Sequence, residues 1–122
     1  MNGRLFVTGL AIAIGMGVDL LSAGDWPQWR GPDRTDVSRE TGLLKEWPKD
    51  GPAKVWMNDN VGLGYSGFSV VQGKLFTMGA RDDAEFLICL DAHTGKELWA
   101  TRLGNVLDNG WGDGPRGTPT VD

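Results

Sequence analysis

The sequence has little of several residue types, and each shortage excludes a class of protein or site. Cys89 is the single cysteine, so a framework of internal disulfides is excluded. His93 is the single histidine, so any histidine-based catalytic or metal site would depend on this one residue. The formal net charge is −4 with the charges scattered along the chain, which argues against a nucleic-acid-binding protein. Beyond the first two dozen residues, no stretch longer than a turn or two has helical periodicity.

Glycine, proline and tryptophan are, by contrast, abundant, with 19, 6 and 6 residues. Many glycines together with many tryptophans are typical of short strands and tight turns, with large aromatic side chains filling the spaces between sheets. We therefore expect an all-β chain.

Residues 1–24 have the pattern of a secretory signal peptide. Arg4 supplies a positive charge, Leu5–Val18 is a short apolar run, and the small residues Ser22, Ala23 and Gly24 follow. The run is shorter than the roughly 20 residues that a membrane span needs. We expect cleavage after Gly24, export to the periplasm or the cell exterior, and no stable membrane insertion afterwards. A signal anchor is the alternative.

Residues 25–53 form a second unit that is rich in proline and tryptophan. Its four prolines exclude a central strand or a long helix. Its large apolar residues distinguish it from a disordered tail. We expect an extended arm that packs its aromatic side chains onto the β-domain. The prolines are Pro27, Pro32, Pro48 and Pro52, and the apolar residues are Trp26, Trp29, Leu43, Leu44 and Trp47.

The remaining chain alternates between apolar, β-branched runs and turn residues. Gln72-Gly73 separates two such runs and predicts a tight hairpin, with the glycine at positive φ. Asp91–Lys96 predicts a turn in which Asp91 accepts backbone hydrogen bonds and Gly95 is left-handed. A loop is predicted at Gly79–Ala84. The predicted strands are 67–71, 74–78, 85–90 and 97–102, in antiparallel succession, with a further short strand at 54–57.

The sequence repeats itself at the spacing of a propeller blade. Lys54-Val55-Trp56 recurs as Glu97-Leu98-Trp99, and Ser66–Val71 recurs as Arg116–Val121, both after about 40–50 positions. Residues 54–122 are therefore predicted to hold a partial β-propeller. It comprises about one complete four-stranded antiparallel blade plus strands of the two neighbouring blades, and it stops after the first strand of the next blade. A propeller needs about four to eight blades, so we expect an N-terminal fragment whose partners include the missing blades.

One motif carries a resemblance to a known family. Leu90–Trp99 resembles the repeat signature Leu-Asp-Ala-x-Thr-Gly-Lys-x-x-Trp of the pyrroloquinoline-quinone-like (PQQ-like) β-propeller proteins. Asp25–Pro32 and Thr41–Pro48 are similar to the start of secreted members common in planctomycete-type bacteria. The signature residues are Leu90, Asp91, Ala92, Thr94, Gly95, Lys96 and Trp99, together with Trp56 one repeat earlier.

The resemblance implies a propeller whose tryptophans dock adjacent blades, but it leaves function open. Our leading interpretation is a non-catalytic binding or scaffold module whose partner is an envelope protein or a small ligand. One alternative is a fragment of a quinoprotein oxidoreductase that acts on alcohols or sugars with PQQ and Ca²⁺, a cofactor pair that only the resemblance implies. Those enzymes often carry an adjacent cysteine pair, whereas this chain has Cys89 alone. A second alternative is a truncated remnant with no activity of its own.

No catalytic set and no metal site is visible in the sequence. The candidates for ligand or partner contact are the residues that enter first strands and would approach the propeller axis. These are Tyr65, Trp111, Asp113 and Arg116.

Other chemistry-bearing residues have simpler interpretations. We expect His93 in a surface turn and Cys89 buried and inert in an apolar strand. Trp56 and Trp99 are expected in the core of blade interfaces. The acidic residues Asp82, Asp83 and Glu85 predict a solvated loop tip. A weak cation site there is the alternative, although their spacing lacks the order of a Ca²⁺ loop.

Overall fold

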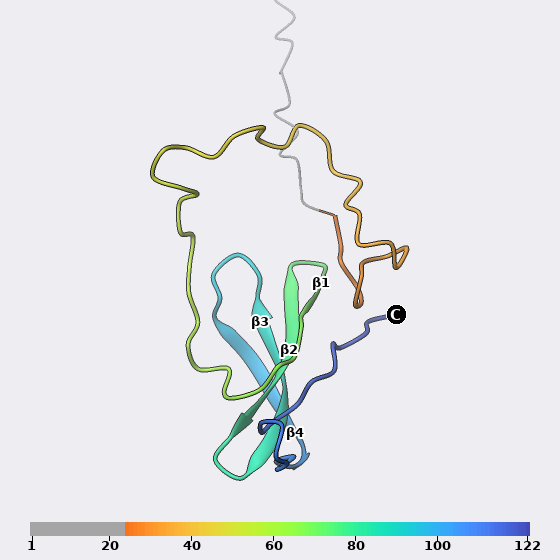
Figure 1. The fold of residues 1–122 in the computed structure, drawn as a ribbon, viewed down its shortest axis with the longest axis vertical. Helices are drawn as coiled ribbons and strands as arrows, with labels where there is room; N and C mark the ends of the chain where they lie inside the picture. The colour runs from red at the N-terminus through yellow and green to blue at the C-terminus, as the bar shows by residue number, and fades with distance from the viewer. Residues whose placement is uncertain (1–23) are drawn as a thin grey trace, which may run out of the picture.

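The computed structural model describes residues 24–122, which form one four-stranded antiparallel sheet with long connecting segments (Figure 1). Its strands follow one another in the order β1-β2-β3-β4, as a meander. The described part contains no helix, and so none that is long and apolar enough to cross a membrane. The predicted all-β class and the run of four antiparallel strands are confirmed. The strands are β1 (Ser69–Val71), β2 (Lys74–Arg81), β3 (Ala84–Asp91) and β4 (Glu97–Asn105).

The predicted signal segment falls almost entirely on residues 1–23, which lie outside the described residues. Of that segment the structure describes only Gly24. Export and cleavage after Gly24 therefore stay predictions.

Two turns have the geometry that their sequences predict. In the β1–β2 hairpin, Gln72 and Gly73 both have positive φ, 50° and 72°, as the two central residues of a type I′ turn require. In the β3–β4 turn, Gly95 has φ 70°. The carboxylate of Asp91 accepts hydrogen bonds from the amides of His93 and Thr94, at 3.0 and 2.8 Å. The turn angles at Gln72 and Gly73 and the Asp91 bonds thus stabilise the two hairpin turns locally.

The loop predicted at Gly79–Ala84 is wrong, because β2 continues to Arg81 and only Asp82 and Asp83 form the turn. The reason lies in a distant segment. Leu63 exchanges two backbone hydrogen bonds with Ala80, at 2.9 and 2.7 Å, so residues 61–63 cross the sheet at this point. A Cβ at position 79 would collide with the carbonyl of Val61. Gly79 thus serves the close approach of two backbones rather than a turn.

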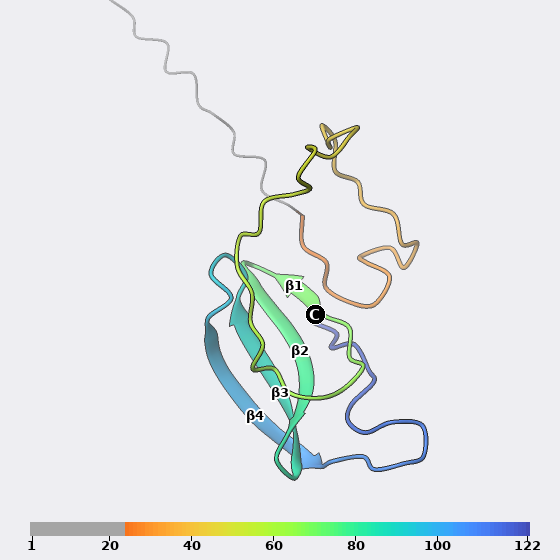
Figure 2. The same ribbon diagram turned by 60° about the vertical axis from the view of Figure 1, so that its left-hand side comes forward.

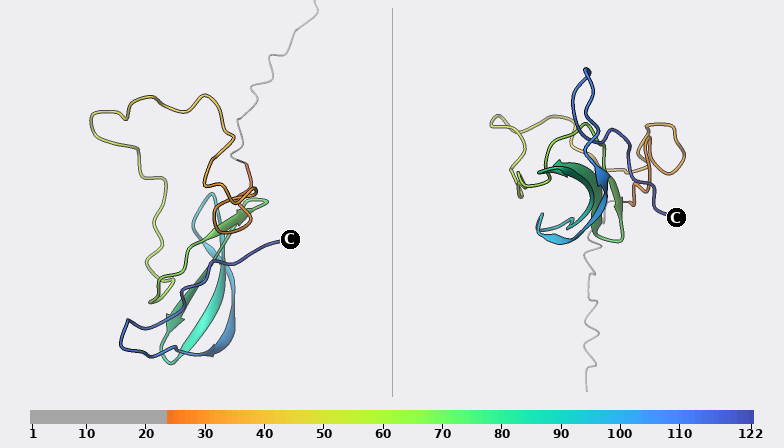
Figure 3. Two further views of the ribbon diagram at one scale, coloured as in Figure 1. Left: turned by 45° about the vertical axis from the view of Figure 1, so that its right-hand side comes forward. Right: turned by 90° about the horizontal axis from the view of Figure 1, so that it is seen from below.

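The sheet is strongly curled, as the end-on view in Figure 3 shows. Register shifts between β3 and β4 at Glu85/Phe86 and Cys89/Leu90 contribute to this curl, since bulges bend a strand and increase its twist. The small core centres on β3, and the prediction that Cys89 is buried is confirmed. The buried hydrophobic residues are Ala80, Ala84, Ile88, Cys89 and Leu90.

The strands predicted for the two neighbouring repeats are absent from the sheet. Residues 54–57 and 116–121 run without strand pairing, so the strand predictions there are wrong. A strand is defined by hydrogen bonds to a neighbouring strand, and no strand in the described part lies beside either segment in the required register. Instead, Trp56 bonds to the β3–β4 turn, and the 116–121 segment bonds to Ser66 and Pro27, which lie outside the strands.

The arm packs differently from the prediction. Trp26 is half-buried and pairs with Val70 of β1 as an isolated antiparallel bridge. The rest of the arm bends away from the sheet (Figure 2). The contact of Trp26 with the sheet is made by its backbone, and its ring lies on Gly31 of the arm, so the prediction that the arm packs its aromatics onto the sheet is not confirmed. The other large apolar side chains are 64–71 % exposed, namely Trp29, Leu43, Leu44 and Trp47.

The close approach at Gly79 predicts a strong dependence of stability on the size of this residue. Gly79→Ala places a methyl group against the Val61 carbonyl and is expected to lower the free energy of unfolding by about 1–3 kcal/mol. Gly104→Ala in β4 is the matched control, because nothing lies within 4 Å of its added methyl group. Urea denaturation of both variants measures the difference. Equal stability of the two would contradict the crossing at residues 61–63.

Candidate functional site

Two of the predicted contact residues lie together at one end of the sheet. The guanidinium carbon of Arg116 is 5.1 Å from the centroid of the Tyr65 ring. The same guanidinium donates a hydrogen bond to the carbonyl of Gly112, with Nη2 2.6 Å from the oxygen. Gly112 has φ 111° and packs against the Tyr65 ring, where a side chain would not fit. Tyr65 and Arg116 are therefore in direct contact, while their role in binding a ligand or partner stays a prediction.

The other two predicted residues occupy separate places on the same loop. Trp111 is 91 % exposed, and its backbone amide donates to the side chain of Asn109 at 2.9 Å. Asp113 lines a neighbouring cleft. The loop thus presents an aromatic ring to solvent on one side and a carboxylate to the cleft on the other. Of the four predicted residues, this cleft is lined by Asp113 alone.

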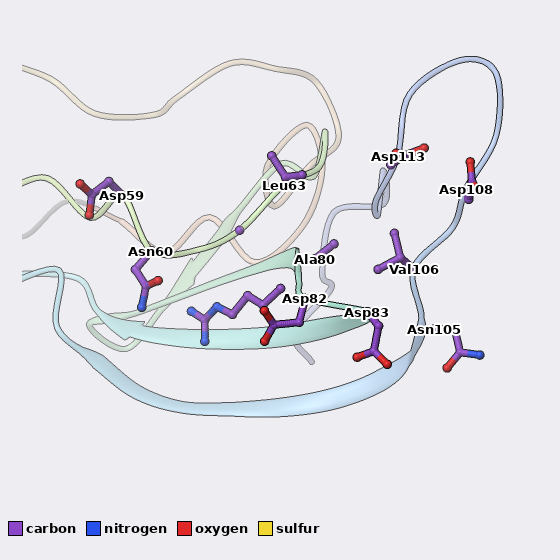
Figure 4. A pocket seen from close by; sticks show the side chains of 12 residues that line it. Asp59, Asn60, Leu63, Ala80, Asp82, Asp83, Asn105, Val106, Asp108 and Asp113 are labelled. Carbon is purple, nitrogen blue, oxygen red and sulfur yellow. The ribbon is translucent and has the colours of Figure 1, made fainter.

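The cleft has a volume of ≈ 830 Å³ and is lined mainly by acidic and amide side chains (Figure 4). The carboxylates come from three segments: the chain before β1, the β2–β3 turn and the loop after β4. Arg81 is the one positively charged lining residue, and it is paired with Glu97 at 2.6 Å. This hydrogen bond is the main reason that the pKa of the Glu97 carboxyl is lowered. The acidic lining residues are Asp59, Asp82, Asp83, Asp108 and Asp113.

The carboxylates of the cleft do not form a metal centre. Figure 4 shows them spread along the cleft rather than gathered at one point. In residues 24–122, no group of three His, Cys, Asp or Glu side chains is placed to hold a metal ion. Glu85 is used otherwise, since its carboxylate accepts a hydrogen bond from the Leu107 amide at 2.8 Å. The donor set therefore does not fit the Ca²⁺ that the resemblance implies, and no step through a quinone cofactor follows.

A more specific contact joins the chain before β1 to the β3–β4 turn. The indole Nε1–H of Trp56 donates to the carbonyl of Ala92 at 3.0 Å. The indole ring covers Gly95, which is buried and where any Cβ would collide with the ring. Asn58 adds a second bond, from its Nδ2 to the Gly95 carbonyl at 2.8 Å. We call this the Trp56 docking contact; it joins positions that are 36 and 37 residues apart.

The turn beneath Trp56 is held in shape by Asp91. The Thr94 hydroxyl and amide, both 2.8 Å from Oδ1, donate to the carboxylate, and the His93 amide donates as well. These bonds, led by that of the Thr94 hydroxyl, lower the pKa of Asp91, because they favour the charged carboxylate. His93 itself is exposed, so its predicted place in a surface turn is confirmed. Thus Asp, Thr and Gly of the repeat signature all shape the surface on which Trp56 lies.

Trp99 occupies the position equivalent to Trp56 one repeat later, but its surroundings differ. It remains 42 % exposed, and its ring lies 6.1 Å from that of Phe76, which pairs with the same neighbour in β3. Within the described part of the chain, no hydrogen bond to the Trp99 indole is present. The two residues predicted for blade interfaces are therefore in different states, Trp56 docked and Trp99 open. Sequence reasoning missed Asn58, whose role has no signal beyond its closeness to Trp56.

Comparison with known proteins gave no match to a protein family model, to a curated protein or to a solved structure. The chemistry open to the chain follows from its own residues. Burial raises the pKa of the Cys89 thiol, which disfavours the reactive thiolate. In the described residues no hydrogen bond pairs Cys89 with His93. Cys89 and His93 are therefore not arranged as a nucleophile beside its base.

The Asp91 bonds predict a pH-dependent turn. The folded-state pKa lies below the ordinary value of 3.8, so the charged carboxylate contributes stability that is present above that value. This stability is lost as the pH falls through the lowered folded-state pKa. Amide hydrogen exchange at His93 and Thr94, corrected for intrinsic rates, is expected to accelerate over this acid range. Asp91→Asn is the control, because its amide oxygen accepts the same bonds without titrating. An equal pH dependence in both proteins would rule out Asp91 as the cause.

Proposed function

We propose that this chain is an exported repeat module of the PQQ-like β-propeller type that serves as a non-catalytic binding or scaffold unit. The observation that carries the proposal is the Trp56 docking contact. Trp56, which the proposal assigns to one repeat, lies on the Asp-x-x-Thr-Gly turn, which the proposal assigns to the next, and bonds to its backbone. Repeat proteins are stabilised by such contacts between neighbouring units.

The sequence repeat suggests that Trp99 makes the same kind of contact with a following sheet. Trp99 corresponds to Trp56, and it ends half-exposed beside Phe76. In the proposal, the Trp99 indole docks on the equivalent turn of a following sheet, as Trp56 docks on the Asp91–Lys96 turn. Covering the remaining exposed part of a tryptophan is worth roughly 2 kcal/mol at about 25 cal/mol per Å². A following sheet would also cover Leu98 and Leu103, which are exposed on β4.

The binding role is proposed for the end of the sheet where Tyr65 and Arg116 meet. In a propeller the connecting loops, rather than the packed strands, are free to meet a partner. The 105–116 loop presents Trp111, and Trp, Tyr and Arg are the residue types that dominate binding energy at protein interfaces. We therefore place the contact with an envelope protein or a small ligand at this loop end.

A lengthened chain tests the repeat proposal directly. Adding a second copy of residues 73–122 after Asp122 supplies a following sheet with its own Asp-x-x-Thr-Gly turn. Trp99→Ala in this tandem chain is expected to lower the free energy of unfolding by about 2 kcal/mol or more beyond its effect in the original chain. The reason is that Trp99 gains a surface to cover only in the tandem.

Trp111→Ala in the same tandem chain is the matched control, because this tryptophan is exposed on a loop away from the sheet faces. Its effect is expected to be within about 0.5 kcal/mol in both chains. If the cost of Trp99→Ala is the same in the original and the tandem chain, the repeat proposal is wrong.

A further inference from the structure

Residues 25–27 lie along the free edge of β1, where they form a short backbone ladder. The Trp26 amide donates to the Val70 carbonyl at 2.7 Å, and the Val70 amide donates to the Trp26 carbonyl at 2.9 Å. Beside this pair, the Asp25 carboxylate accepts a hydrogen bond from the Gln72 amide at 2.9 Å. We call residues 25–27 the strap. It satisfies the outward-facing backbone groups of Val70, which β2 does not reach.

The far side of the strap is also occupied. The Pro27 carbonyl accepts a hydrogen bond from the Val121 amide at 2.9 Å. Nearer the loop end, the Tyr65 amide donates a hydrogen bond directly to the Pro115 carbonyl, at 2.8 Å. The chain from Tyr65 to Val70 and the chain from Pro115 to Val121 therefore bond to each other at their first residues. At their last residues the strap lies between them. Segments distant in sequence are thus joined by three consecutive residues.

The strap is held in orientation by its own tryptophan. The Trp26 ring covers Gly31, which is buried and has φ 80°, and a Cβ at this position would lie 2.7 Å from the ring. The loop after the strap is closed by the Asp36 amide bonding to the Arg30 carbonyl at 3.1 Å, and the two side chains form an ion pair at 2.7 Å. Pro27 lacks an amide hydrogen, so it ends the ladder after Trp26.

The two edges of the sheet differ in their need for such a cover. An open strand edge invites another strand to add, and proteins oppose this with charges, prolines or a covering segment. β1 reads Ser-Val-Val and contains neither charge nor proline. β4, at the opposite edge, carries Glu97 and Arg102 and bulges against β3. The uncharged edge is the one that the strap covers.

We propose that the strap is a built-in guard that occupies the β1 edge and blocks the addition of a strand from another copy of the chain. With the strap displaced, the β1 edge of a second copy is the occupant that fits, since antiparallel pairing of Val70 with Val70 would satisfy the same outward-facing amide and carbonyl in both copies. This inference concerns the edge of the sheet, whereas the proposed function concerns its faces, so each can fail without the other.

Trp26→Pro in the full chain tests the guard, because proline removes both the amide that bonds to Val70 and the ring on Gly31. Amide hydrogen exchange at Val70, Gln72 and Val121 is expected to become at least about tenfold faster, while Ile88 and Leu90 of the core keep their rates. Leu44→Pro is the control for a new proline in the arm, since its side chain is exposed. Unchanged exchange at Val70 in the Trp26→Pro protein would overturn the proposal.

A synthetic peptide with the sequence of residues 24–32 provides the complementary test. Added to the Trp26→Pro protein, it is expected to restore protection at Val70 and to reverse the dimer formation expected in analytical ultracentrifugation. A scrambled peptide is expected to do neither. Failure of the matched peptide to restore protection, or a Trp26→Pro protein that stays monomeric with an exposed edge, would refute the guard.

If amide exchange at Ile88 and Leu90 also becomes faster in the Trp26→Pro protein, the Asp25→Ala variant distinguishes loss of the strap from loss of the fold. It removes one acceptor and leaves Trp26 in place, so faster exchange is expected at Gln72 alone. Asp25→Asn keeps the acceptor oxygen and is expected to restore the rate. Equal rates in the alanine and asparagine variants would count against a docked strap.

Discussion

The docking of Trp56 on the β3–β4 turn is the interaction on which the rest of the structure depends. The sheet has a small core centred on β3, and its curled faces leave large side chains half-covered. The Trp56 indole covers the β3–β4 turn. Hydrogen bonds between Asp91 and Thr94 hold this turn in shape, and Gly95 has no side chain that would collide with the ring. Buried apolar area beyond the small core therefore comes from contact between the β3–β4 turn and the chain before β1.

The edges of the sheet follow a different constraint from its faces. Backbone amides and carbonyls at an edge must meet water, charge or another strand. The strap meets this requirement at β1, and at β4 the charged Glu97 and Arg102 oppose the addition of another strand. The arm is therefore held at its first residues, while most of its length bends away from the sheet (Figure 2).

Local signals predicted much of the fold, and contacts between distant segments account for the errors. The Gln72-Gly73 pair and the Asp91–Lys96 turn predict both hairpins, because the residue types dictate the backbone angles. Gly79 was read as part of a loop because the sequence does not show that the distant Val61 lies against it. In the structure, this close approach is what requires glycine at position 79. The strap is made of backbone bonds, which have no residue signature, so the sequence does not reveal it. Tyr65 and Arg116 were predicted as contact residues because both enter first strands of the repeat, and their contact with each other was not foreseen. The exposure of Trp111 depends on the conformation of its loop.

The most direct test of the central contact is a nuclear magnetic resonance measurement on the full chain. Because the Trp56 ring covers Gly95, ring currents should shift the α-proton resonances of Gly95 strongly upfield. Nuclear Overhauser effects should also connect these protons to the indole, whose Nε1–H should exchange slowly. A Gly95 resonance at its random-coil position, together with a rapidly exchanging Trp56 indole, would contradict the account.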